Sequence, residues 1–169
     1  MAEKIIPWND ERVADLLSAL REMKLTVGTA ESCTAGMISA RIADIPGSSD
    51  VLTGGIVSYS NDVKMKLLGV SEKTLRERGA VSDECAGEMA EGARSALGCD
   101  IAVSVTGIAG PGGGTPDKPV GTVCFGISSS DGVLTKTERF GEAAGRAGIR
   151  TLTVAAALGM IEDKIKNRG

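Results

Sequence analysis

Segments with helical hydrophobic spacing alternate with short apolar runs along the chain, and this order constrains the fold more than any other feature. Helices are expected at 9–24, 34–43, 61–68, 71–79, 82–98 and 146–165, and strands at 25–30, 51–59, 100–107, 119–128 and 133–140. The alternation favours an α/β architecture with helices on both faces of a sheet. The short turn "SSDG" makes the last two strands a hairpin, so the sheet must be mixed. We therefore predict a three-layer α/β/α sandwich with a mixed, mostly parallel sheet, formed by residues 1–169 as a single domain.

Composition argues against several classes of function. The net charge of −3 disfavours a nucleic-acid partner, because such proteins neutralise phosphates with a basic surface. No apolar run is long enough to span a membrane, and "MAEKIIPWND" lacks the apolar stretch of a signal peptide, so we expect a cytoplasmic protein. Histidine is absent and the four cysteines lack CxxC spacing, which predicts reduced thiols and no metal site. Aromatic residues make up 2% of the chain, so the core must be aliphatic.

The segment "ESCT" places three potential nucleophiles at the junction of a strand and a helix. Ser32, Cys33 and Thr34 follow Glu31, where the strand ends. The free N–H groups of a helix N-terminus can hold a phosphate or a developing oxyanion. Catalysis and simple capping of the helix by Ser32 are both compatible with this position. The missing histidine excludes a Ser-His-Asp triad and leaves Cys33 without its usual base.

A lysine is the candidate proton acceptor in "SYSNDVK", residues 58–64. With Asn61 as helix cap, Lys64 lies in the first turn, where the positive helix end and burial both favour the neutral amine. A neutral lysine is a competent base, and Ser-Lys pairs act where histidine is missing. The hydroxyl of Tyr59 is placed to relay a proton or hold the lysine. The alternative is a solvated surface lysine with Tyr59 at the sheet edge.

Two further segments are candidates for ligand binding. The glycine-rich loop 107–118 follows a buried strand, and such a loop allows its backbone to approach a ligand, although a plain connection is the alternative. It is neither a Walker loop nor a GxGxxG turn. Arg146 and Arg150 lie four residues apart in the last helix and form either a phosphate clamp or ordinary surface arginines.

In order and spacing, "AESCTAG", "IPGSSDVLTGGIVSYSNDVKMKLLGV", "GAVS" and "SVTGIAGPGGG…KPVGTV" resemble the CinA C-terminal domain family, over about residues 8–165. The resemblance implies an α/β/α amidase that hydrolyses the carboxamide of nicotinamide mononucleotide to nicotinate mononucleotide and ammonia, in pyridine nucleotide recycling. The family's nucleophile matches Ser32, and its lysine and tyrosine match Lys64 and Tyr59. The implied mechanism needs no metal or cofactor, and the implied assembly is a homodimer or a higher homo-oligomer.

We expect the substrate, a pyridine mononucleotide, to be contacted from three segments. The expected contacts are Glu31, Cys33, Thr34, Thr106, Gly107, Ala109, Gly110 and Arg146. Related sequences tend to read Phe-x-Gly-Asp-Arg before the last helix, whereas this chain reads "FGEAAGRAGIR", which puts the placement of Arg146 in question. Two other functions remain open: a nucleotide-binding module without turnover, and an amidase acting on a different small carboxamide.

Overall fold

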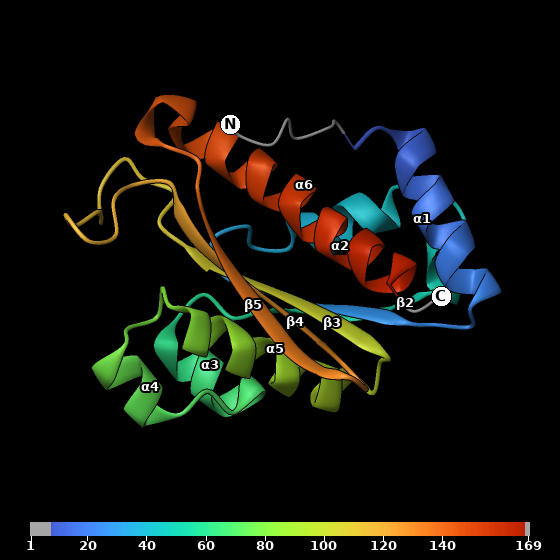
Figure 1. The fold of residues 1–169 in the computed structure, drawn as a ribbon, viewed down its shortest axis with the longest axis horizontal. Helices are drawn as coiled ribbons and strands as arrows, with labels where there is room; N and C mark the ends of the chain where they lie inside the picture. The colour runs from blue at the N-terminus through green and yellow to red at the C-terminus, as the bar shows by residue number, and fades with distance from the viewer. Residues whose placement is uncertain (1–7, 168–169) are drawn as a thin grey trace.

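A five-stranded mixed sheet forms the middle layer of the fold (Figure 1). The computed structural model describes residues 8–167. Most of the segment "MAEKIIPWND", which we predict not to be a signal peptide, lies outside the described residues. The strands are β1 (Val27–Glu31), β2 (Leu52–Val57), β3 (Ile101–Gly107), β4 (Thr122–Ser129) and β5 (Gly132–Arg139), in the order β2-β1-β3-β4-β5. β1 pairs in parallel with β2 and β3, whereas β3–β4 and β4–β5 are antiparallel. The predicted α/β fold with a mixed sheet is confirmed.

Helices cover both faces of this sheet (Figure 1). They are α1 (Asp10–Glu22), α2 (Met37–Ala43), α3 (Asn61–Leu68), α4 (Glu72–Glu77), α5 (Asp83–Leu97) and α6 (Gly145–Lys166), with short 3-10 turns η1 (Ser48–Asp50) and η2 (Glu142–Ala144). α1, α2 and α6 lie on one face, and α3, α4 and α5 lie on the other. Among the described residues, no helix is both long and apolar enough to cross a membrane.

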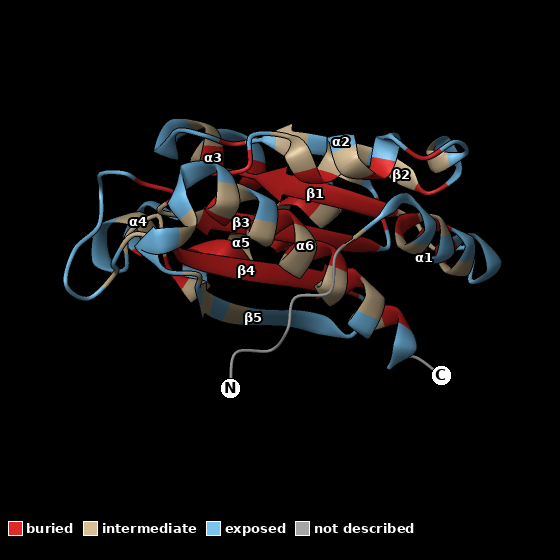
Figure 2. Ribbon diagram, turned by 90° about the horizontal axis from the view of Figure 1, so that it is seen from above, coloured by how far each residue is buried: buried red, intermediate tan, exposed pale blue. Residues whose placement is uncertain are grey.

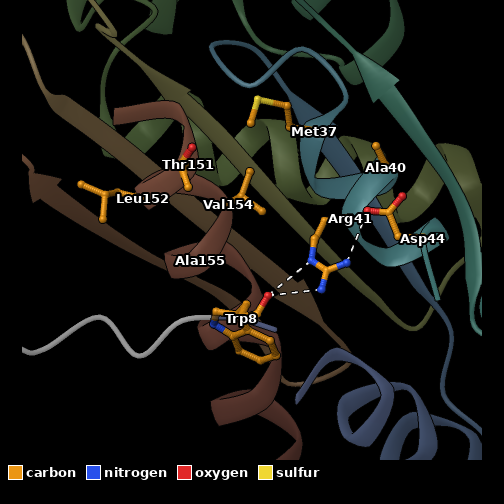
Figure 3. Close-up of a pocket in the computed structure, with 9 residues that line it drawn as sticks. All are labelled: Trp8, Met37, Ala40, Arg41, Asp44, Thr151, Leu152, Val154 and Ala155. Atoms are coloured by element: carbon orange, nitrogen blue, oxygen red, sulfur yellow. Dashed lines mark hydrogen bonds and ion pairs between the residues drawn. The ribbon is translucent and has the colours of Figure 1, made fainter. Parts of the chain in front are cut away.

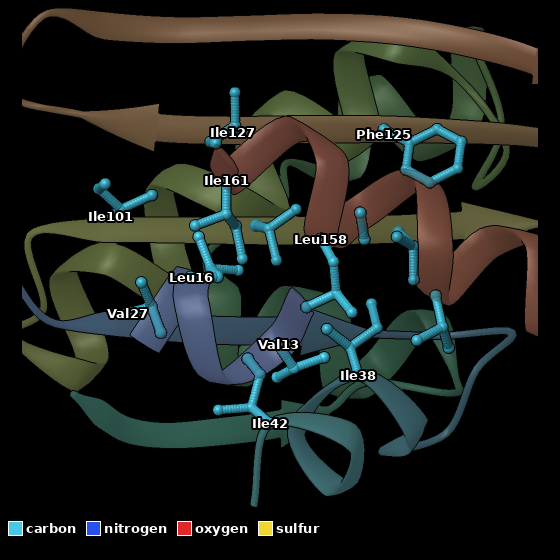
Figure 4. Packing of buried hydrophobic residues seen from close by; sticks show 14 of the residues in the cluster. Val13, Leu16, Val27, Ile38, Ile42, Ile101, Phe125, Ile127, Leu158 and Ile161 are labelled. Carbon is cyan, nitrogen blue, oxygen red and sulfur yellow. The ribbon is translucent and has the colours of Figure 1, made fainter. Parts of the chain in front are cut away.

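The core between the sheet and α1, α2 and α6 is aliphatic, as composition predicts (Figure 4). Within residues 8–167, Phe125 is the one aromatic side chain in the buried core. The central strands are buried on both faces, whereas β5 at the edge is largely exposed (Figure 2). Each large aliphatic side chain buried in this way contributes about 1.5–3 kcal/mol. The buried centre gives the strand ends a rigid base on which a site can be built.

Several predicted boundaries differ from the structure by one to three residues, and local backbone chemistry explains two of the differences. α2 begins at Met37 rather than at 34, because Ala35 and Gly36 have left-handed backbones (φ 51° and 98°) that a right-handed helix cannot contain. Ser60, not Asn61, caps α3: it has the extended backbone of a cap, and its side chain accepts a hydrogen bond from the Val63 N–H. β4 begins at 122 rather than 119.

Candidate active site

Ser32 lies just beyond the carboxyl end of β1, between the ends of its two neighbours. Its backbone N–H donates to the carbonyl of Val105 on β3, at 3.0 Å. On the other side, the N–H of Ser58 donates to the carbonyl of Glu31, at 2.8 Å. The parallel pairing of three strands thus continues up to the nucleophile candidate. In α/β folds this edge of the sheet is where ligands bind.

The carboxylate of Glu31 holds the loop that follows the strand. It is completely buried, and Oε2 accepts hydrogen bonds from the Thr34 hydroxyl (2.6 Å) and from the N–H groups of Gly36 and Ile38 (3.0 Å each). Oε1 accepts from the N–H of Ser39, at 2.9 Å. Gly36 has no side chain with which to cap α2, so the Glu31 carboxylate caps it instead. Both Glu31 and Thr34 are buried, and their side chains shape the loop. Their contact with a substrate stays a prediction.

The Ser32 hydroxyl is not needed as a helix cap. α2 begins five residues later, and its N-cap is Gly36. The Ser32 Oγ atom instead lies 3.1 Å from the Nζ atom of Lys64. Of the two interpretations open from sequence, the structure therefore favours the one in which Ser32 pairs with a base.

Lys64 is a buried lysine with a matched set of partners. It is 1% exposed, and its Nζ atom lies 2.8 Å from the carbonyl oxygen of Ser58 and 3.4 Å from that of Tyr59, besides Ser32 Oγ. A neutral amine has two N–H groups and one lone pair. In the charged form, Lys64 Nζ donates to Ser32 Oγ and to both carbonyls. Once the amine is neutral, the two carbonyls take its two N–H groups, and the lone pair is left to accept a hydrogen bond from the Ser32 hydroxyl. The alternative of a solvated surface lysine is excluded.

The electrostatics of the site separate the base from the thiol. Burial lowers the pKa of Lys64 from its ordinary value, although nearby Cys85 and Cys33 raise it in part. Burial also raises the pKa of the Cys33 thiol to about 11, with Glu31 adding to the effect. At neutral pH the thiol therefore keeps its proton, whereas the amine loses its proton more readily than usual. This difference favours Ser32 over Cys33 as the nucleophile.

Arg146 lies at the site despite the altered segment that precedes it. Its Nη1 donates to the carbonyl of Gly110, at 2.8 Å, and its Nη2 donates to the hydroxyl of Tyr59, at 3.2 Å. The 3-10 turn η2 contains three of the residues that separate Phe140 from this arginine. Tyr59 is 60% exposed, and it holds Lys64 through its backbone carbonyl while its hydroxyl faces Arg146.

These side chains surround a pocket of about 210 Å³. The predicted residues that line it are Ser32, Cys33, Tyr59, Lys64, Thr106, Gly107, Ala109 and Arg146. Three further residues line the pocket that the sequence does not predict as site residues: Asn61, Ala80 and Val81. The motif "GAVS" contains two of them, Ala80 and Val81, and the sequence pattern predicts Asn61 only as a helix cap. The Thr106 hydroxyl donates to the carbonyl of Ala80, at 2.8 Å, and so holds that segment at the pocket.

Comparison with known proteins gives the family. The model of the CinA C-terminal domain matches residues 9–165. The chain belongs to the CinA C-terminal domain family. A CinA-like protein of Thermotoga maritima is 45% identical over 167 residues, and one of Mycolicibacterium gilvum is 46% identical over 161. These alignments cover 98% and 95% of this chain but 40% and 36% of the relatives, so the chain spans about two fifths of their length.

Solved structures of CinA proteins have the same fold. The competence/damage inducible protein CihA of Agrobacterium tumefaciens is 42% identical and has a TM-score of 0.89, covering 96% of this chain and 98% of that one. A CinA superfamily protein of Escherichia coli is 31% identical with a TM-score of 0.82, covering 94% of each chain. The carboxyl end of β1, which carries Ser32, is therefore part of an architecture that this chain shares with these solved structures.

A second, larger pocket of about 580 Å³ lies between α2 and α6 of this CinA domain (Figure 3). Its lining is mainly apolar, and Arg41 at its rim donates to the carbonyl of Trp8 and to Asp44. It contains no nucleophile beside a base among its described lining residues. Within residues 8–167, no cluster of side chains could hold a metal ion. The pocket at Ser32, in contrast, places a hydroxyl beside a buried amine.

Proposed function

We propose that this CinA domain hydrolyses the carboxamide of nicotinamide mononucleotide to nicotinate mononucleotide and ammonia, as a step in pyridine nucleotide recycling. The observation that carries the proposal is the contact between Ser32 Oγ and the buried amine of Lys64, at 3.1 Å, in a pocket bordered by Arg146. A serine with a lysine base is suited to acyl transfer from an amide. The resemblance of the surrounding motifs to nicotinamide-nucleotide amidases supports the choice of substrate.

In the proposed reaction, Ser32 Oγ attacks the amide carbon while its proton passes to Lys64 Nζ. The C–N bond then breaks, and ammonia leaves with the proton that Lys64 returns. An ester between Ser32 and the nicotinate group remains, and water attacks its carbon while giving a proton to the same amine. The ester C–O bond then breaks, and Lys64 returns the proton to Ser32 Oγ. Nicotinate mononucleotide and the free serine are the products, so each proton that the lysine takes is given back.

The substrate's own charge assists a modest nucleophile. The positively charged pyridinium ring withdraws electrons from the carboxamide and makes its carbon more electrophilic. The phosphate at the other end matches Arg146, whose guanidinium lies at the mouth of the pocket between Gly110 and Tyr59. This arrangement supports a phosphorylated nucleotide over free nicotinamide.

The test is ammonia release from nicotinamide mononucleotide by the purified protein, with nicotinamide riboside, nicotinamide and asparagine compared at equal concentration. We expect turnover of the mononucleotide above all others, and none by Ser32→Ala. Turnover without preference for the phosphorylated compound would indicate a general small-carboxamide amidase. Saturable binding of the mononucleotide without any product would indicate a nucleotide-binding module and would reject the proposal.

A further inference from the structure

We infer that Arg150 is a positioning residue that orients the oxyanion-binding peptide groups beside Ser32, an inference that rests on the proposed function. Arg150 lies on α6, far from Ser32 in sequence. Its Nε donates to the carbonyl of Cys33, at 3.0 Å, and its Nη2 donates to the carbonyl of Thr34, at 3.1 Å. The fork of one guanidinium therefore binds two successive carbonyls of the loop that follows Ser32.

Fixing a carbonyl also fixes an N–H group, because the two point in opposite directions across a trans peptide. When Arg150 binds the Cys33 carbonyl, the Thr34 N–H must point away from the guanidinium. The preceding peptide is held in a similar way, since the Ser32 carbonyl accepts from the N–H of Ala35, at 3.1 Å. This bond turns the Cys33 N–H to the opposite side of its own peptide.

The two N–H groups that follow the nucleophile have no acceptor on another described residue, and the Cys33 N–H faces its own thiol. Among residues 8–167, neither the Cys33 N–H nor the Thr34 N–H donates a hydrogen bond to another residue. Donors with fixed orientation near a nucleophile are what the oxyanion of a tetrahedral intermediate requires. A hydrogen bond accepted by the carbonyl of a peptide also polarises that peptide, which strengthens its N–H as a donor.

The loop needs such a restraint because part of its backbone is strained. Ala35 has a φ of 51°, a conformation that an L-residue with a side chain adopts at a cost. Glu31 accepts hydrogen bonds from the N–H groups at the start of α2, where the loop ends. Arg150, on α6, binds two carbonyls in the first part of the loop. Without Arg150 the two peptides can rotate, while Glu31 keeps the rest of the loop folded.

The experiment compares Arg150→Ala and Arg150→Lys with Arg21→Ala, a matched control whose guanidinium binds the carbonyl of Gly47, just before η1. Kinetics with nicotinamide mononucleotide should show kcat reduced by about 100-fold in Arg150→Ala, with KM changed by no more than a few-fold, as for loss of an oxyanion donor. Lysine can bind one carbonyl but not both, so Arg150→Lys should recover part of the rate. Millimolar guanidinium ion should raise the rate of Arg150→Ala and leave Arg21→Ala unchanged.

A second measurement does not depend on the substrate. A fluorophosphonate probe reacts with an activated serine and places its own oxygen in the oxyanion site, so its rate of attachment to Ser32, followed by intact mass, should fall in Arg150→Ala and not in Arg21→Ala. Wild-type labelling without ammonia release would reject the proposed substrate but would still test Arg150. Unchanged kcat in Arg150→Ala, an effect on KM alone, equal loss in Arg150→Lys without rescue, or no labelling of wild-type Ser32 would each overturn the inference.

Discussion

Lys64 Nζ lies 3.1 Å from Ser32 Oγ and 2.8 Å from the carbonyl oxygen of Ser58, with a third oxygen, from Tyr59, at 3.4 Å. Two of the three partners can only accept, so a neutral amine must direct its lone pair at the serine. The pairing brings together residues 32 positions apart in sequence. It connects the end of β1 to the first turn of α3, and it is the basis of the predictions that follow.

Replacing the nucleophile should remove activity without unfolding the protein. We expect Ser32→Ala to release no measurable ammonia from nicotinamide mononucleotide, because among the described residues no other hydroxyl is hydrogen-bonded to Lys64. The Cys33→Ser variant should keep activity within a few-fold of wild type, since a thiol with a pKa of about 11 is not the reacting group. Thermal unfolding should show both variants folded. An inactive Cys33→Ser beside an active Ser32→Ala would reverse the assignment.

The rate should rise with pH as Lys64 loses its proton. Because burial lowers the pKa of Lys64, the midpoint of this rise in kcat/KM should lie below the ordinary lysine value of 10.5. Lys64→Arg keeps a positive charge but cannot give up its proton, so the variant cannot act as a base. Its turnover number should be at least about 100-fold lower than that of the wild type at every pH. Lys66→Arg, an exposed lysine on the same helix, is the control and should behave as wild type. A pH-independent rate would contradict the role of Lys64 as the base.

The same lysine should make stability depend on pH. The pKa of Lys64 is lower in the folded chain than its ordinary value of 10.5, which applies to the unfolded chain. At pH values between the folded pKa and 10.5, the unfolded chain binds more protons than the folded one, so the free energy of unfolding rises with pH. Relative to Lys64→Met, the free energy of unfolding of the wild type should therefore increase across this window, by at most about 1.4 kcal/mol per pH unit. Urea titrations at several pH values give the difference, with Lys66→Met as the control. A constant difference would mean that the pKa of Lys64 is not lowered.

Glu31 should matter for stability more than a surface carboxylate does. In Glu31→Gln one acceptor becomes a donor that faces other donors at the start of α2, so we expect a loss of about 1–3 kcal/mol in the free energy of unfolding. Glu88→Gln is the matched control, because Glu88 also accepts from a backbone N–H and from hydroxyls, in a more exposed place. Equal effects of the two substitutions in urea denaturation would show that burial of Glu31 adds nothing.

Tyr59→Phe tests what the tyrosine hydroxyl does. Its partner in the structure is Arg146, at 3.2 Å, and the lysine is held by the Tyr59 backbone, which the substitution keeps. We therefore expect a rise in KM of a few-fold, with the turnover number and its pH dependence almost unchanged. If turnover instead slowed by about 100-fold or more at constant KM, the result would support the proton relay that the sequence alone suggests.

Much of the fold follows from patterns within single segments. The order of helices and strands, the hairpin of β4 and β5, and the place of Ser32 at a strand–helix junction all depend on hydrophobic spacing and turn residues that neighbours in sequence determine. Boundaries fail where one residue's backbone decides, as at Ala35 and Ser60. The absence of histidine, which the composition alone shows, makes Lys64 the candidate base.

Contacts between distant segments were decided by tertiary structure alone. The sequence places Glu31 at the substrate and joins Arg146 and Arg150 in one possible phosphate clamp, whereas packing buries Glu31 beneath the loop and gives the two arginines different partners. Arg150 and Cys33 are 117 positions apart, and their contact depends on how α6 packs across the sheet. Hydrophobic spacing determines which face of α6 is buried, but the position of the helix along the sheet depends on the shape of the whole core. For that reason the sequence by itself identified the candidate nucleophile and its base, and only the folded chain showed what holds them in place.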